Sequence, residues 1–268
     1  MKKKSKAKKK SIVETLKQTV MNKRDFIKLV NGNEYKLGVK VGSKVDLEFD
    51  LLMKYFEALG KKYNPDFFID EMDIPVFEKL FYYFTQNKIW CSTNNININK
   101  GIMLVGGNGV GKSTILRLFT EFFGMGKLKY YSMSELGEKV SRDGLSTLDA
   151  INFSRAFVID DVGSEKESMY FGIRTEVFNS ILMKFEHKNF PAYKPDEEGL
   201  ISLISNADKE TTRLNPSKPA RIYASTNLCL DEFEERYGKR VYSRMAGFFN
   251  ILNFPTRTDK RALLANVV

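Results

Sequence analysis

A glycine-rich segment in the middle of the chain constrains the fold more than any other feature. In order, it consists of Gly106, Gly107, Asn108, Gly109, Val110, Gly111, Lys112, Ser113 and Thr114. It fits the pattern G-x-x-x-x-G-K-[ST]. The apolar residues 101–105 before it predict a buried strand, and apolar side chains at helical spacing over residues 114–123 predict a helix. This order is typical of a phosphate-binding loop; a glycine-rich turn without a ligand is the alternative.

Each part of this segment has a chemical reason. Glycines allow consecutive backbone N–H groups to turn toward one phosphate, and the N-terminus of the following helix adds a positive partial charge there. We expect Lys112 to contact the β- and γ-phosphates and the Ser113 hydroxyl to hold Mg²⁺. A dinucleotide fingerprint is excluded, because Lys112 occupies the position of its third glycine.

Positive charge is concentrated at the start of the chain. The formal net charge is +10, from 43 basic and 33 acidic residues. Residues 1–10 hold seven lysines and no acid, so the rest carries only +3. We expect residues 1–10 to form a disordered basic tail, because such a charge density prevents independent folding. The tail either keeps the protein in solution or binds nucleic acid in a salt-sensitive way.

Other aspects of the composition exclude whole classes of protein. Cys91, Cys229 and His187 are the only residues of their kinds, so zinc clusters of known spacing are excluded. No apolar run approaches the roughly 18 residues of a membrane span, and no signal-peptide core follows the lysines. We therefore expect a cytoplasmic protein without a membrane partner.

Residues 11–70 are predicted to be a small, mostly helical N-terminal region that binds a partner. Residues 11–45 are polar and interrupted by glycine and asparagine, so they receive no assignment. Apolar side chains on one face predict a helix that begins at the cap Asp46 and ends at Gly60. Residues 71–268 are predicted to form the larger domain, which opens with another amphipathic helix.

Two acidic residues end a second apolar stretch. Residues 156–159 predict a buried strand, and Asp160 and Asp161 follow directly. Ligands of parallel α/β sheets bind at the carboxyl ends of the strands, so these carboxylates are expected beside the phosphates. They fit a Walker B element, in which Asp160 holds Mg²⁺ through water and Asp161 orients or deprotonates the attacking water. A strand that merely ends in a solvated Asp-Asp turn is the alternative.

A third stretch ends in polar residues. Residues 220–227 predict a strand that ends at Asn227, which we expect beside the γ-phosphate, bonded to the attacking water. Residues 173–188 before it predict a long amphipathic helix. Residues 189–219 contain four prolines and are predicted to be a loop insertion. Strands that alternate with helices predict an α/β fold with a parallel sheet of five strands flanked by helices.

The phosphate loop, the Asp-Asp strand, the strand ending at Asn227 and a late arginine cluster together resemble the AAA+ P-loop NTPases. Residues 160–165, 225–228 and 237–245 are similar to the DnaC-type helicase-loader branch, which includes the ATPase helpers of some transposases. The resemblance covers about residues 90–261. It implies an ATPase that binds ATP and Mg²⁺ and self-associates through its ATPase domain.

The resemblance also implies roles for single residues. Asn227 would be sensor 1. Arg244 would be an arginine finger that enters the nucleotide site of a neighbouring subunit, with Arg240 as the second candidate. Arg257 or Arg261 would act as a sensor 2 residue.

The predicted function is that of an ATP-dependent helicase loader in DNA replication, cellular or phage. It would place a replicative helicase on single-stranded DNA, and residues 11–70 would bind that helicase or only support the ATPase domain. A transposition helper ATPase and a nucleotide-gated DNA-binding switch with little turnover are the alternatives. Contact with DNA is expected from aromatic and basic side chains, or these belong to the core and the solvated surface. They are Tyr130, Tyr131, Lys139 and Arg142.

Overall fold

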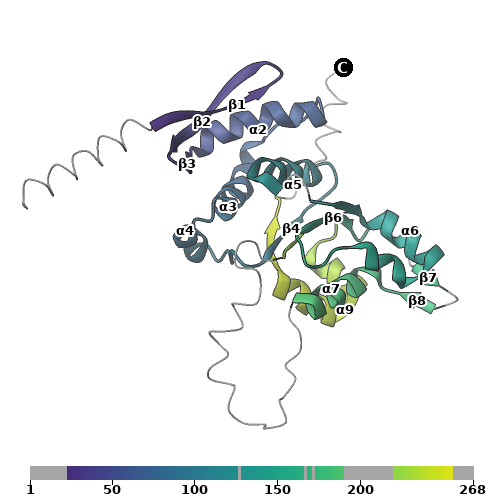
Figure 1. Ribbon diagram of the computed structural model, residues 1–268. Helices are drawn as coiled ribbons and strands as arrows, with labels where there is room; N and C mark the ends of the chain where they lie inside the picture. Colours follow the sequence, from purple (N-terminus) through teal and green to yellow (C-terminus); the bar gives the residue numbers. More distant parts are fainter. Residues whose placement is uncertain (1–22, 126–127, 166–167, 171–172, 190–219, 256–268) are drawn as a thin grey trace, which may run out of the picture. The chain divides into compact units, whose positions relative to one another are not determined.

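The computed structural model describes residues 23–125, 128–165, 168–170, 173–189 and 220–255 (Figure 1). The chain divides after Glu71 into two compact units, which are described separately. The predicted basic tail, almost all of the predicted insertion at 189–219, Arg257 and Arg261 lie outside the described residues. Among the described helices, none combines the length and the apolar character that crossing a membrane requires.

The first unit is a three-stranded antiparallel sheet with one helix. Its elements are β1 (Lys23–Val30), β2 (Asn33–Val41), β3 (Lys44–Leu47) and α2 (Phe49–Tyr63), with the sheet order β1-β2-β3. Asn31 and Gly32 join β1 to β2 with positive φ angles of 51° and 82°. A two-residue Asn-Gly turn of this kind suits the twist of a hairpin. The apolar stripe of α2 buries Leu52 and Phe56.

This sheet corrects part of the sequence prediction. Within its described residues, 23–70, the expected mostly helical region is helical only in α2, because the Asn-Gly pair closes a hairpin rather than merely interrupting the chain. The predicted cap Asp46 lies in β3, and the helix begins at Phe49. Gly60 does not end the helix either. A Cβ atom there would lie 2.1 Å from the ring of Phe67, so glycine allows that ring to pack against the helix.

The second unit is built around a parallel sheet. A short turn, η1 (Glu71–Asp73), stands at the division. The elements that follow are α3 (Ile74–Phe84), α4 (Lys88–Thr93), β4 (Gly101–Val105), α5 (Lys112–Thr120), η2 (Glu121–Met125), β5 (Tyr130–Ser132), α6 (Met133–Asp143), η3 (Leu145–Ala150), β6 (Phe157–Val162), β7 (Ser168–Tyr170), β8 (Ile173–Thr175), α7 (Val177–Asn189), β9 (Ile222–Thr226), α9 (Leu230–Phe248) and β10 (Phe249–Asn253).

The sheet order is β10-β4-β9-β6-β5, and all four neighbouring pairs are parallel. The predicted fold, a five-stranded parallel sheet flanked by helices, is confirmed. The predicted helix at 173–188 begins later, at Val177, because residues 173–175 form β8 of a two-stranded antiparallel ribbon.

Helices cover both faces of this sheet. On one face, α6, α7 and α9 pack with the strands into a buried apolar cluster. On the other face, Phe84 of α3 stacks on Phe119 of α5 and on Tyr223 of β9, with ring centroids 5.4 and 5.7 Å apart. Strands β4 and β9 are buried throughout, as expected for central strands covered on both sides. The carboxyl ends of β4, β9 and β6 therefore meet at one rigid edge of the sheet.

Candidate active site

The glycine-rich loop connects β4 to α5 at this edge. Gly109 and Gly111 have φ angles of 72° and 93°, which glycine adopts without strain, and Gly111 is the N-cap of α5. Gly106 is constrained by space instead, because a Cβ atom there would lie 2.8 Å from the Cβ atom of Phe254. The backbone of the loop is thus free to curve, and it ends at the N-terminus of a helix, where anions bind.

Lys112 is the first residue of α5, and only 5% of it is exposed. Its ammonium group donates to the carbonyl oxygens of Gly106 and Gly107, both at 2.8 Å, and to Oδ1 of Asn227 at 2.6 Å. An ammonium has three donors, and these three acceptors compensate for its loss of water. Phosphate oxygens bound in the loop would compete for the same donors.

Ser113 and Asp160 meet beside Lys112. The Ser113 hydroxyl donates to Oδ1 of Asp160 at 2.8 Å, across 47 positions of the sequence. The fully buried Ser225 of β9 donates to the same carboxylate oxygen at 2.5 Å. Two hydroxyl groups therefore fix the orientation of Asp160. The hydroxyl and the carboxylate are hard oxygen ligands, and their closeness fits a Mg²⁺ ion that also keeps water ligands.

Asp161 has an unusual backbone conformation. Its φ angle is 56°, although it is not glycine, and the pairing of β6 with β9 shifts register between Ile159 and Val162. Such a conformation costs about 1–3 kcal/mol and persists only where neighbouring groups hold it. Here the Asp161 N–H donates to the Ser225 hydroxyl at 2.9 Å, and the Ser164 N–H donates to the Asp161 carbonyl at 2.9 Å. The irregularity turns two consecutive carboxylates toward the site, which a regular strand would place on opposite faces.

Asn227 lies between the lysine and this second carboxylate. Its Oδ1 accepts from Lys112, and its Nδ2 lies 3.5 Å from Oδ1 of Asp161, which is a long contact. The preceding Thr226 is buried and donates to the Val162 carbonyl at 2.7 Å, so the end of β9 is fixed against β6. The structure thus brings together five predicted residues: Lys112, Ser113, Asp160, Asp161 and Asn227.

Arg244 does not join this group. It lies on α9, and its Nε donates to Oε2 of Glu186 on α7 at 3.0 Å. Among the described residues, no hydrogen bond or ion pair links Arg244 to the five residues at the strand edge. Its predicted role in a neighbouring subunit stays a prediction. Arg240, the second candidate, is exposed on the same helix.

Sequence reasoning missed two residues that hold the site. Ser225 bridges Asp160 and the backbone of Asp161. It stands in the 225–228 motif and near the end of a predicted strand, but neither signal indicated this role. Glu165 is buried, and its carboxylate accepts from the Gly163 N–H at 2.9 Å and from the Tyr237 hydroxyl. Arg236 donates to the Glu165 carbonyl oxygen. Glu165 therefore ties the segment after Asp161 to α9.

Burial governs the ionisation of Glu165 and Tyr237. It raises the pKa of Glu165 above its ordinary value of 4.5, although the hydrogen bond from Tyr237 and the nearby Arg236 act in the opposite direction. Burial, together with the charge of Glu165, also raises the pKa of Tyr237, so the phenol stays protonated and donates to the carboxylate.

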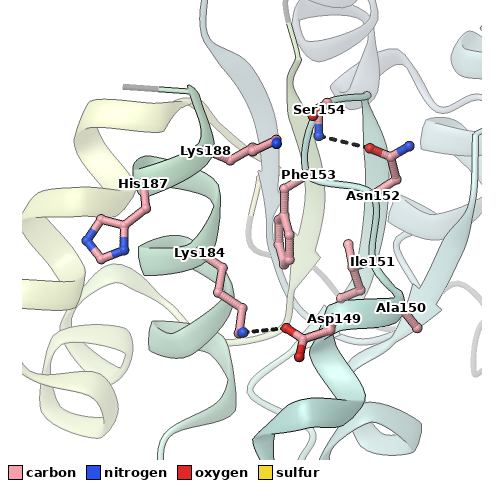
Figure 2. A pocket seen from close by; sticks show the side chains of 9 residues that line it. All are labelled: Asp149, Ala150, Ile151, Asn152, Phe153, Ser154, Lys184, His187 and Lys188. Carbon is pink, nitrogen blue, oxygen red and sulfur yellow. Dashed lines mark hydrogen bonds and ion pairs between the residues drawn. The ribbon is translucent and has the colours of Figure 1, made fainter. Parts of the chain in front are cut away.

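A separate cavity of about 650 Å³ lies at the opposite end of β6 (Figure 2). Its lining comes from the segment before β6 and from the last turns of α7; the residues are Asp149, Ala150, Ile151, Asn152, Phe153, Ser154, Lys184, His187 and Lys188. Lys184 and Asp149 form an ion pair of 2.6 Å across its rim. No predicted site residue lines this cavity.

Comparison with solved structures returns proteins of DNA replication. A candidate primosome component from Streptococcus pyogenes serotype M3 is 14% identical, covers 70% of this chain and 82% of its own, and has a TM-score of 0.42. The DnaC helicase loader is 15% identical in sequence; the match covers 73% of this chain and 99% of the loader, with a TM-score of 0.38. AMPPCP-bound DnaA from Aquifex aeolicus is 12% identical in sequence; the match covers 75% of this chain and 52% of DnaA, with a TM-score of 0.37.

No protein-family model and no curated protein matches the sequence. Identities and TM-scores this low transfer no activity and no partner to this chain.

The position of Ser225 gives a first prediction. Ser225→Ala removes a donor to Asp160 and the acceptor for the Asp161 N–H, so turnover and Mg²⁺ affinity should each fall about 10- to 100-fold. Mg²⁺ titration of nucleotide hydrolysis measures both. Ser180→Ala is the matched control, because among the described residues that hydroxyl donates to the Glu176 carbonyl of its own helical region and not to the site. Wild-type Mg²⁺ dependence in folded Ser225→Ala would contradict the assigned role.

The raised pKa of Glu165 gives a second prediction. Between about pH 4.5 and its folded-state pKa, the folded protein binds more protons at this residue than the unfolded chain does, so its contribution to stability falls as pH rises. The free energy of unfolding of the wild type minus that of Glu165→Gln should therefore decrease with pH in this window. Denaturant unfolding at several pH values measures it.

Glu232→Gln is the control of opposite sign. The N–H of Cys229 lowers the pKa of Glu232, so its stabilisation is present above the ordinary value of 4.5 and is lost as pH falls. Equal pH slopes for the two variants would show that burial does not perturb Glu165.

Proposed function

We propose that this chain is a cytoplasmic ATPase that uses ATP to control the placement of a replicative helicase on single-stranded DNA. The observation that carries the ATPase part is the convergence of Lys112, Ser113, Asp160, Asp161 and Asn227 at one strand edge, next to a helix N-terminus. The loader part is supported by the motifs at residues 160–165, 225–228 and 237–245, which resemble the DnaC-type branch.

Binding of the nucleotide is assigned to the loop from Gly106 to Thr114. Its backbone N–H groups and the N-terminus of α5 would bind phosphate oxygens. The Lys112 ammonium would leave its carbonyl partners and bind phosphate oxygens instead. Ser113 and Asp160 would hold Mg²⁺, which neutralises charge on the phosphates when bound. Both side chains are already oriented by their mutual hydrogen bond.

Hydrolysis is assigned to the groups next to this pocket. Asp161 would accept a proton from the attacking water, and Asn227 would orient that water. The two side chains are 3.5 Å apart at their nearest polar atoms, so one water can reach both. Arg244 would stabilise charge on the γ-phosphoryl group of a neighbouring subunit; within its own subunit it donates to Glu186.

The first unit is the proposed contact for the helicase. Its β1 is an edge strand that exposes Ile27 and Leu29, by 44% and 65%. An exposed apolar edge strand favours pairing with another protein. DNA contact is assigned to Tyr130, which is 41% exposed, and to the basic residues of α6; Tyr131 instead packs edge-on against Phe157.

The first test separates binding from hydrolysis. Lys112→Ala should lose nucleotide binding, because the positive charge at the phosphates is removed. Asp161→Asn should bind ATP normally and lose turnover by at least about 100-fold, because ground-state contacts remain while proton transfer is lost. Nucleotide binding by fluorescence and phosphate release measure the two steps, with and without single-stranded DNA.

Asp149→Asn is the matched control, because this carboxylate lies at the other end of β6 and pairs with Lys184. Wild-type turnover in Asp161→Asn would disprove the role of Asp161. Tight ATP binding with negligible turnover in the wild type would favour the nucleotide-gated switch.

The second test identifies the partner. The wild type, immobilised and saturated with ATP, should retain the purified ring helicase of its source organism. Leu29→Ser should weaken this binding about 10- to 100-fold, the effect of exposing one buried leucine, and leave ATPase activity unchanged. Leu145→Ser is the control, since Leu145 is 41% exposed on the ATPase unit. Retention of a transposase instead of the helicase would support the transposition helper.

A further inference from the structure

The ion pair of Arg244 lies on two helices that are fixed to each other. Val241 and Met245 flank Arg244 on α9 and are buried in the core. Phe185, next to Glu186 on α7, contacts Phe248 of α9 edge-to-face with ring centroids 5.5 Å apart. The side chains of Arg244 and Glu186 are 30% and 39% exposed. The pair is therefore a partly exposed group on a rigid support, not a contact between two mobile loops.

The bond uses one particular edge of the guanidinium. In the described part of the chain, Arg244 donates to Glu186 through Nε, at 3.0 Å. A guanidinium carries five N–H donors in a plane, and the two terminal nitrogens form a fork of their own. A carboxylate at Nε fixes the plane of the group and leaves the terminal fork for a planar or tetrahedral oxyanion.

We propose that Glu186 is a positioning residue for Arg244, which holds the Nε edge so that the terminal nitrogens engage the γ-phosphate of ATP in a neighbouring subunit. This inference rests on the proposed trans role of Arg244 and adds the residue that orients it. Because Glu186 binds Nε rather than the terminal fork, phosphate and carboxylate occupy different donors and do not compete. Glu186 thus acts as a support rather than as a latch that phosphate must displace.

Mixed assemblies test this directly. An acceptor subunit with Arg244→Ala keeps its nucleotide site but lacks the arginine. A donor subunit with Lys112→Ala cannot bind nucleotide but keeps Arg244. Only an interface between the two joins an intact site to an intact arginine, so turnover of the mixture measures the donor's arginine alone.

The donor is then varied at Glu186. Lys112→Ala with Glu186→Ala should restore at least tenfold less turnover than the Lys112→Ala donor, with an unchanged KM for ATP. Lys112→Ala with Glu186→Gln should restore an intermediate value, because its amide oxygen still accepts from Nε. The matched control is Lys112→Ala with Asp149→Ala. This change breaks the ion pair between Asp149 and Lys184, which lies on α7 like Glu186 (Figure 2). This control should restore as much as Lys112→Ala alone.

Thermal unfolding of each donor, and co-assembly followed with two affinity tags, accompany the assay. If the Glu186→Ala donor restores as much turnover as the Asp149→Ala donor, Glu186 is only a surface ion-pair partner. If it restores more, Glu186 competes with phosphate for Arg244 instead of positioning it. Either result overturns the proposal. If the Lys112→Ala donor itself restores nothing, or the subunits do not assemble, the trans role of Arg244 fails and this inference fails with it.

Discussion

The loss of regular pairing between β6 and β9 is the constraint on which the candidate site depends. At that point the Ser225 hydroxyl accepts the N–H of Asp161 and donates to the carboxylate of Asp160. One side chain therefore replaces a strand-to-strand hydrogen bond and also orients a carboxylate. A regular ladder would send one of the two acids away from the loop. The positive φ of Asp161 is held by this serine and by the turn to Ser164.

The charges of the site are arranged around a single amide. Asn227 accepts from the Lys112 ammonium and directs its Nδ2 toward Asp161. An amide is able to serve both neighbours because it carries an acceptor and donors on one planar group. Asn227 thereby links the buried ammonium to the carboxylate of Asp161 through one side chain.

The sequence predicted the features that depend on local pattern. Central strands covered on both faces appear as short apolar runs, so β4, β6 and β9 and the polar residues at their ends were recognisable. Glu165 and Glu186 carried no such signal, because their partners Tyr237 and Arg244 lie 72 and 58 positions away and only the packing of α9 brings them together. The sheet of the first unit was not predicted, because its strands are largely polar and lack the apolar alternation that marks a half-buried strand. The Asn-Gly pair between them was therefore not recognised as a hairpin turn.

Helix α9 connects the two halves of the proposed mechanism. Gly238 interrupts it with φ 80° and ψ 164°, a conformation that only glycine adopts readily. Before this break, Glu165 binds Tyr237 and Arg236, so the first segment follows the backbone that carries Asp161. After it, Glu186 of α7 binds Arg244. Phe178 of α7 also contacts Phe233 and Tyr237 before the break, so both segments of α9 pack on α7. The break at Gly238 therefore changes the course of α9 between two fixed ends, so that one helix holds the segment after Asp161 and also presents Arg244 beside α7.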